Sequence, residues 1–217
     1  MQWLQLLLWC TLAGYGVGNR SRRCITAAVL TAGLAVSMAS QLYLLWLDDL
    51  LSLQTALPLH LCGMMAVLCI PLCWISFPAG DHLLMLLGLP GALLALLFPA
   101  VTPCTHPLLM QMAFLRLHVL IAAVAVFLRA QKKPLPQDPR KAFLLGNSFL
   151  ILVACINDLL GSNYLFLRAA PSGTPLAFLI RPGYGIYIAS LELLCMLLMR
   201  LLTDLYGRAY FRKYESM

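Results

Sequence analysis

Residues 108–128 read Leu-Leu-Met-Gln-Met-Ala-Phe-Leu-Arg-Leu-His-Val-Leu-Ile-Ala-Ala-Val-Ala-Val-Phe-Leu, an almost unbroken apolar run. A helix that crosses a bilayer needs about 20 mostly apolar residues, because lipid offers no hydrogen-bond partner for a bare N–H or C=O group. This stretch meets that length, and its only ionisable side chains are Arg116 and His118. It therefore predicts a transmembrane helix with two polar residues at membrane depth.

The composition of the whole chain is also typical of a membrane protein. Of its 217 residues, 62% are hydrophobic and 11% are charged, whereas soluble domains use roughly 45–50% apolar residues. These values exclude an ordinary soluble enzyme. The few charges lie in short clusters between apolar runs, without a basic amphipathic stretch interleaved with aromatics. Disordered proteins and nucleic-acid-binding proteins are therefore excluded as well.

Seven segments are predicted as spans, which together predict an all-α polytopic membrane helix bundle forming a single domain over residues 1–217. They are Leu4–Val17, Cys24–Leu45, Leu57–Phe77, His82–Ala100, Leu108–Leu128, Ala142–Ser162 and Ile180–Leu202. The first is the shortest, and a signal peptide is the alternative interpretation of it. A signal peptide carries basic residues before its apolar core, whereas Arg20, Arg22 and Arg23 follow this one, so a retained helix is favoured.

The basic residues predict the orientation of the bundle. Residues 20–23, 129–141 and 200–213 hold three, five and four of the 15 Lys and Arg residues, and a seven-span arrangement puts these segments on one side. Cationic loops stay in the cytoplasm, so we expect the N-terminus outside and the C-terminus inside. Contact with anionic lipid headgroups then explains the net charge of +7.

Polar side chains within the predicted spans indicate where function lies, because each costs at least about 2.5–3.5 kcal/mol to insert. Most belong to the outer half or the middle of the predicted membrane, and they are His60, Cys62, Arg116, His118, Asn157, Asp158 and Glu192. Asn147 is the comparable residue of the inner half. This asymmetry predicts one polar cavity open toward the outer face. The helical rise places His60 level with Asp158 and His118 level with Glu192, which suggests two pairs.

Cys62 is the candidate nucleophile of this cavity. A buried thiol needs an adjacent base or cation to form the thiolate. His60, two residues away, lies on nearly the opposite helix face, so the base should come from another helix, where His118 is the candidate. The predicted depths of Cys62 and His118 differ by roughly 7 Å, a mismatch that helix tilt would close. Pro58 is typical of a helix N-terminus, whose partial positive charge favours a thiolate.

Four segments carry a resemblance to a known family: the block Leu57-Pro58-Leu59-His60-Leu61-Cys62, the mid-span His118, Asn157–Tyr164 and Leu191–Leu193. Together they resemble the YwaF-like family of bacterial integral membrane proteins. That family looks like a relative of a eukaryotic transmembrane acyltransferase that moves fatty acyl chains onto lyso ether phospholipids with a Cys and a His. The resemblance implies that these are Cys62 and His118, and that the protein lies in the cytoplasmic membrane of a bacterium. Asp158 is not part of the family pattern.

The residues and the resemblance give one mechanistic hypothesis. Cys62 attacks a phospholipid ester, His118 takes and returns the proton, and Glu192 orients His118. The guanidinium of Arg116 binds the lipid phosphate. The headgroup end of the pocket is shaped by His60, Asn157, Asn163 and Tyr164. The expected partners are membrane lipids, and no nucleic acid, cofactor, metal or obligatory protein partner is implied.

Other interpretations stay open. The His, Asp and Glu residues are also typical of a proton relay in a transporter or lipid sensor, although no paired repeat accompanies them. A structural ion pair with Asp158 or Glu192 is an alternative role for Arg116. Cys69 and Cys73, on the same helix face as Cys62, are interpreted as small packing residues.

Overall fold

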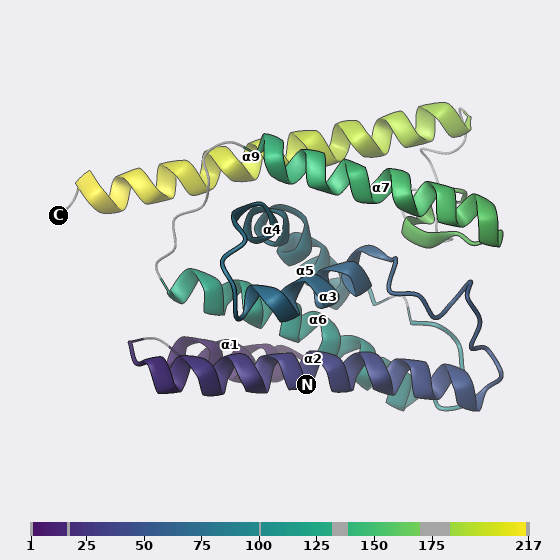
Figure 1. The fold of residues 1–217 in the computed structure, drawn as a ribbon, viewed down its shortest axis with the longest axis horizontal. Coiled ribbons are helices and arrows are strands. Elements are labelled where there is room, and N and C mark those ends of the chain that lie inside the picture. The colour runs from purple at the N-terminus through teal and green to yellow at the C-terminus, as the bar shows by residue number, and fades with distance from the viewer. Residues whose placement is uncertain (1, 17, 100, 132–138, 170–182, 216–217) are drawn as a thin grey trace.

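The chain forms only helices and loops in the computed structural model, which describes residues 2–16, 18–99, 101–131, 139–169 and 183–215 (Figure 1). This outcome confirms the all-α prediction. The helices are α1 (Gln2–Tyr15), α2 (Arg20–Leu47), α3 (Leu61–Leu72), α4 (Pro78–Leu83), the π-helix η1 (Leu84–Gly88), α5 (Leu89–Leu97), α6 (Pro107–Ala130), α7 (Arg140–Leu160), the 3₁₀-helix η2 (Tyr164–Phe166) and α9 (Tyr184–Glu215).

Three layers of helices make up the bundle (Figure 1). Helices α1 and α2 form one outer layer, α3 to α6 form the middle, and α7 and α9 form the opposite outer layer. Helix α6 is the central element, because it packs against α1, α2, α3 and α5. Its small buried residues Ala122, Ala123 and Ala125 let neighbouring helices approach closely, as in other membrane bundles.

The predicted spans correspond to seven helical regions, since α4, η1 and α5 run together as one. Five regions are long and apolar enough to cross a membrane: Arg20–Leu47, Pro78–Leu97, Pro107–Ala130, Arg140–Leu160 and Gly185–Tyr206. Helices α1 and α3 are apolar but shorter. The protein is therefore a multi-pass membrane protein, and the count of seven crossings and the orientation stay predictions. The predicted ends Val17, Ala100 and Ile180 lie outside the described residues.

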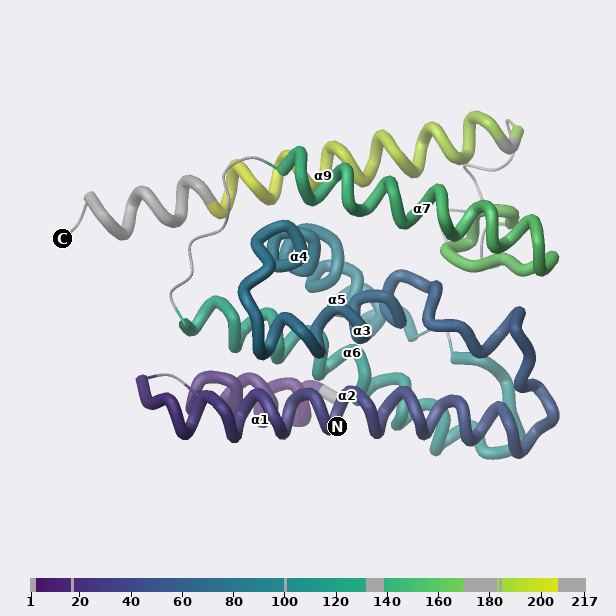
Figure 2. The backbone as a smooth tube through the Cα atoms, viewed as in Figure 1, coloured from purple at the N-terminus to yellow at the C-terminus, as the bar shows by residue number. Residues whose placement is uncertain are grey.

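The third predicted span, Leu57–Phe77, is wrong at both ends, because α3 covers only Leu61–Leu72. The residue before Pro58 is disfavoured in a helix, and His60 has an extended backbone with φ −70° and ψ 153°. Near the other end, Pro71 has no N–H to continue the helical bonds. Figure 2 follows the chain from the end of α2 into α3, which begins nearer the middle of the molecule than the adjacent ends of α2 and α7.

Candidate functional site

The block that carries Cys62 turns tightly into α3. His60 is the N-cap of this helix, so Cys62 is its second residue. A Cβ atom on Gly63 would lie 3.0 Å from the Cα and 3.2 Å from the carbonyl oxygen of Pro58. The absence of a side chain at Gly63 therefore lets the segment before the helix pack against its first turn, and this turn fixes the approach to Cys62.

The segment before α3 is also held by a cluster of hydrogen bonds at the end of α7, which we call the knot after α7. Its residues are Asn157, Ser162, Asn163 and Tyr164. The Tyr164 hydroxyl donates to the Leu53 carbonyl oxygen at 2.8 Å and accepts from the Leu57 N–H at 3.1 Å. Tyr164 is fully buried, and burial raises the pKa of its phenol, so the hydroxyl keeps the proton that it donates. Tyr164 thus connects η2 to the loop that leads into α3.

Asn157 supports Tyr164 with both ends of its amide. Its Nδ2 donates to the Tyr164 carbonyl oxygen at 2.9 Å, and its Oδ1 accepts from the Tyr164 N–H and the Ser162 hydroxyl, each at 2.8 Å. Gly161, with φ 65°, ends α7 in the left-handed conformation and allows the chain to turn back. The polar atoms of Asn157 are therefore committed to holding the backbone.

Asn163 and His60 complete the knot. Asn163 accepts the backbone N–H groups of Arg168 and Ala169 at 2.9 and 3.1 Å and donates to the Ala169 carbonyl oxygen at 2.8 Å. The His60 ring lies with its centroid 5.2 Å from the rings of both Tyr164 and Phe166. Burial lowers the pKa of His60, which favours the neutral imidazole against these aromatic rings.

His118 is buried at the middle of α6, with only 2% of its surface exposed. Its Nδ1 lies 2.7 Å from the Phe114 carbonyl oxygen one turn earlier, and the Phe114 and His118 rings are tilted by 39° with their centroids 4.1 Å apart. A carbonyl oxygen can only accept, so Nδ1 carries the proton and Nε2 of the neutral ring has the lone pair. Nε2 has no hydrogen-bond partner within the part of the chain that the structure describes.

Cys62 and His118 lie on two helices that pack together, α3 and α6. Cys62 is half-buried and packs against the core cluster that contains Leu117 and Ile121, two neighbours of His118 on α6. Cys69 and Cys73 are buried in this cluster, as the packing interpretation predicted. All eight cysteines are free. Cys62 thus packs against the same apolar core as the residues that flank His118 on α6.

Arg116 is attached to α2 rather than to an acidic residue. Its Nε donates to the Ser37 hydroxyl at 3.0 Å and one terminal nitrogen donates to the Ser40 hydroxyl at 3.2 Å. The predicted alternative, an ion pair with Asp158 or Glu192, is not formed among the described residues. Two serine hydroxyls thus accept hydrogen bonds from part of the Arg116 guanidinium group.

The two depth-matched pairs are also not formed. Asp158 is exposed on α7, and Glu192 is half-buried on α9. Neither makes a hydrogen bond or ion pair with a described residue, so Asp158 does not contact His60 and Glu192 does not bond to His118. Cys62 lies on α3 and His118 lies on α6, two helices that pack against each other, whereas Glu192 lies on a helix of another layer (Figure 1).

A protein-family model described as the TMEM164 family matches residues 3–203 of the chain. The chain belongs to the TMEM164 family. No curated protein and no solved structure matches the chain. The TMEM164 family match includes the start of α3, His118 on α6, the knot after α7 and Glu192 on α9. Membership of this membrane protein family agrees with the apolar helices of the structure.

A buried charged pair in this TMEM164 family member was missed by the sequence analysis. Asp81 on α4 lies 4.0 Å from Arg129 on α6, and Asp81 is only 5% exposed. His82 beside it is 2% exposed. Asp81 directly precedes the fourth predicted span and Arg129 directly follows the fifth, so both were assigned to loops. Because consecutive spans alternate in direction, the start of the fourth span and the end of the fifth lie on the same side of the membrane. This alternation was the feature of the sequence from which the proximity of Asp81 and Arg129 could have been predicted.

Among the described residues, no three His, Cys, Asp or Glu side chains converge as a metal site would require.

Proposed function

We propose that this TMEM164 family protein is a phospholipid acyltransferase in which Cys62 is the nucleophile and His118 is the general base. The observation that carries this proposal is the state of His118. Its Nδ1 is bonded to the Phe114 carbonyl oxygen, its Nε2 has no hydrogen-bond partner among the described residues, and its helix packs against the one that bears Cys62. The resemblance to the YwaF-like family and its acyltransferase relative supports the same pair of residues.

The Phe114 carbonyl oxygen gives His118 a defined direction and tautomer. A general base needs a free lone pair and a ring held in place, and a partner at the other nitrogen commonly supplies the second condition. In this arrangement the Phe114 carbonyl performs the orienting role that the sequence analysis gave to Glu192. The role of Glu192 stays a prediction, which a separate substitution tests.

Cys62 is favoured as the nucleophile by its place in α3. The first turn of a helix carries unsatisfied N–H groups and a partial positive charge, which stabilise a thiolate. Among the eight cysteines, Cys69 and Cys73 lie deep in the core, where a lipid ester has no access. The first turn of α3 also follows a loop fixed by Tyr164 and Gly63.

The reaction transfers an acyl group in two steps that balance. His118 Nε2 takes the Cys62 proton, the sulfur attacks the ester carbonyl carbon of a donor phospholipid, and a thioester forms. The ester C–O bond breaks, and the leaving glycerol oxygen takes the proton back from His118 as the donor becomes a lysophospholipid. In the second step His118 takes the hydroxyl proton of an acceptor lysophospholipid. Its oxygen attacks the thioester carbonyl carbon, the C–S bond breaks, and the leaving sulfur takes the proton back from His118, which regenerates both Cys62 and the neutral His118.

Arg116 is proposed to bind the phosphate of the donor or acceptor lipid. Its guanidinium has five N–H donors, and Ser37 and Ser40 accept from two of them. The donors that remain suit a phosphate oxygen. His60, Asn157, Asn163 and Tyr164 are proposed to act chiefly by fixing the loop before Cys62, since most of their polar atoms are committed to the knot after α7.

The test uses purified protein in phosphatidylcholine vesicles that contain a fluorescent acyl donor and an ether lysophospholipid acceptor. We expect Cys62→Ala to reduce acyl transfer to background and His118→Gln to reduce it by about 10²–10⁴-fold. Cys155→Ala, which removes an exposed thiol on α7, is the matched control and should retain activity. A fluorescent acyl-enzyme that neutral hydroxylamine releases should form in the wild type and in Cys155→Ala, but not in Cys62→Ala.

Full activity in Cys62→Ala or His118→Gln would overturn the proposal, as would absence of any acyl-enzyme in the wild type. Glu192→Gln tests the remaining role separately. If the Phe114 carbonyl suffices to orient His118, this variant keeps activity within about threefold of the wild type. A loss as large as that of His118→Gln would assign the orienting role to Glu192.

A further inference from the structure

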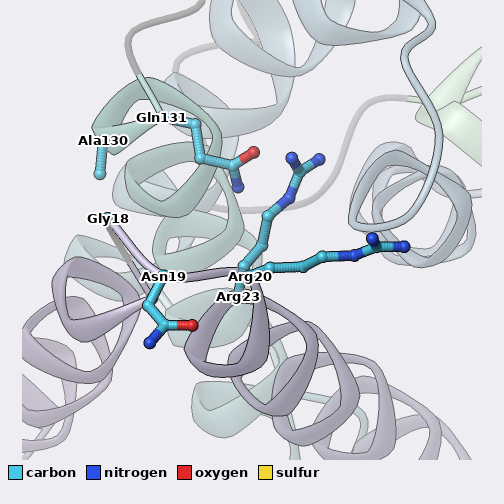
Figure 3. Close-up of a pocket in the computed structure, with 7 residues that line it drawn as sticks. Gly18, Asn19, Arg20, Arg23, Ala130 and Gln131 are labelled. Atoms are coloured by element: carbon cyan, nitrogen blue, oxygen red, sulfur yellow. The ribbon is translucent and has the colours of Figure 1, made fainter.

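A second polar site lies at the other end of α6. Between the turn that joins α1 to α2 and the last residues of α6 there is a pocket of about 630 Å³ (Figure 3). Its lining residues are Gly16, Gly18, Asn19, Arg20, Arg23, Ala130 and Gln131. Gln131 lies about 20 Å further along the helix than His118, at 1.5 Å per residue. The pocket is therefore separate from the proposed acyl-transfer site.

Two guanidinium groups supply the charge of this pocket. Arg20 and Arg23 lie in the first turn of α2, and neither forms an ion pair or a side-chain hydrogen bond with a residue of the described ranges. Arg22, between them, is held elsewhere, with its guanidinium carbon 4.7 Å from the centroid of the Tyr15 ring. None of the described residues that line the pocket carries a carboxylate. Two uncompensated cations thus face one space.

Gln131 supplies an unused amide. Both polar atoms of its side chain are shielded from solvent, and neither has a hydrogen-bond partner in the described part of the chain. Figure 3 shows this amide facing one of the two arginine side chains that line the pocket, while the other arginine extends away from it. A buried amide without partners is costly, because it loses its hydrogen bonds to water. An anion that accepts from Gln131 Nε2 and from the guanidinium groups would remove the cost at the donor end of this amide, while Oε1 can accept only from an N–H or O–H group.

The backbone adds a third favourable feature. The Asn19 side chain accepts the Ser21 N–H at 2.9 Å, which fixes the start of α2 beside the pocket. The N-terminus of this long helix contributes a partial positive charge. Gly16 lets the turn sit against α6, since a Cβ atom there would lie 2.8 Å from the Phe127 ring. Gly18 adopts φ +93°, which favours glycine.

We propose that this pocket binds the phosphate group of an anionic phospholipid. Its members lie at the ends of the apolar spans Arg20–Leu47 and Pro107–Ala130, where lipid headgroups meet the protein. Basic pockets between transmembrane helices are suited to anionic headgroups. A soluble phosphate ester would offer the same phosphate chemistry, so the experiment separates the two sources. This site does not depend on the proposed acyltransferase activity.

The test measures binding of phosphatidylglycerol by native mass spectrometry of the detergent-solubilised full chain, with phosphatidylcholine and glycerol 3-phosphate as the other two ligands. We expect the affinity for phosphatidylglycerol to exceed that for either of the others. Arg20→Gln and Arg23→Gln should each weaken it roughly fivefold, an effect that added salt reduces. Arg22→Gln removes the same charge from the same segment and should weaken it less than twofold.

Gln131→Leu provides the sharpest comparison, because it removes the amide without changing the charge. We expect it to weaken phosphatidylglycerol binding several-fold while the melting temperature without lipid is retained. Equal losses in Arg20→Gln, Arg22→Gln and Arg23→Gln, with none in Gln131→Leu, would overturn the proposal in favour of general charge attraction. Tighter binding of glycerol 3-phosphate than of phosphatidylglycerol would overturn the lipid assignment.

Discussion

Helices α6 and α9 have similar mean hydropathy but occupy different environments. The most apolar stretch of α6 has a mean hydropathy of 2.0, and those of α7 and α9 have 1.9 and 1.8. Nevertheless, 67% of that stretch is buried inside the protein in α6, against 11% in both α7 and α9 (Figure 1). In a bilayer, apolar side chains are equally well accommodated by lipid and by other helices, so hydropathy alone does not distinguish a central helix from a peripheral one.

The difference is accompanied by a contrast between the ionisable residues of α6 and those of α7 and α9. His118 and Arg116 on α6 are bonded to the Phe114 carbonyl oxygen and to Ser37 and Ser40. Glu192 on α9 and Asp158 on α7 bond to no described side chain or backbone group. A polar residue on a central helix is thus oriented by its neighbours, which is the condition for a catalytic role. The first prediction tests this contrast through packing, where the largest effect is expected.

Leu120→Ala on α6 should destabilise the protein by about 2–4 kcal/mol, because Leu120 is fully buried and its removal leaves a cavity. Leu120 also lies against α2, where a Cβ atom on Gly33 would be 3.1 Å from it. Leu194→Ala on α9, where the leucine is 53% exposed, is the matched control and should cost under about 1 kcal/mol. Unfolding by sodium dodecyl sulfate in mixed micelles measures both. Equal losses would mean that α9 is packed as tightly as α6.

Asn157 and Asp158 offer the same contrast within two consecutive residues of α7. Asn157→Ala removes three hydrogen bonds from Tyr164 and Ser162, and we expect a loss of about 2–3 kcal/mol of unfolding free energy. Asp158→Ala, at an exposed position, should change it by no more than about 0.5 kcal/mol. The measurement is the same titration, combined with the acyl-transfer assay. If Asn157→Ala retained full stability and lost only activity, Asn157 would be a direct substrate ligand, as the sequence analysis predicted.

The sequence was sufficient to predict the helices but not their neighbours. Apolar length predicted the seven helical regions, and turn chemistry at Pro58 and Pro71 explains why the third is shorter than expected. Matching by depth did not anticipate that His118 Nδ1 bonds to the Phe114 carbonyl oxygen, because depth fixes only one of the three coordinates of a side chain. The neighbours of α6 depend on small residues such as Gly33 and Ala123, whose role appears only when the facing helix is known. The sequence did predict that the base for Cys62 would come from the helix that carries His118, and the structure shows that this helix, α6, packs against α3.

The smallest expected effect concerns how thermal stability depends on pH. This dependence distinguishes the contact between α2 and the loop before α6 from an ion pair on α9. Asp48, at the end of α2, accepts hydrogen bonds from the hydroxyl and the N–H of Thr105 before α6. The Thr105 hydroxyl, then its N–H, and the nearby His106 lower the pKa of Asp48 below its ordinary value of 3.8. On α9, Asp204 instead pairs with Arg200 at 3.6 Å on an exposed surface.

A lowered pKa means that Asp48 stabilises the folded state above pH 3.8 and that this contribution disappears as the pH falls through the lowered value. Asp48→Asn should therefore melt at a lower temperature than the wild type at neutral pH, and the two should converge in acid. Asp204→Asn should follow the wild type at every pH, because an exposed ion pair contributes little. Melting curves between pH 7 and about pH 3 test this difference. A gap between Asp48→Asn and the wild type that persists unchanged in acid would show that the Asp48 charge does not stabilise the contact between α2 and the loop before α6.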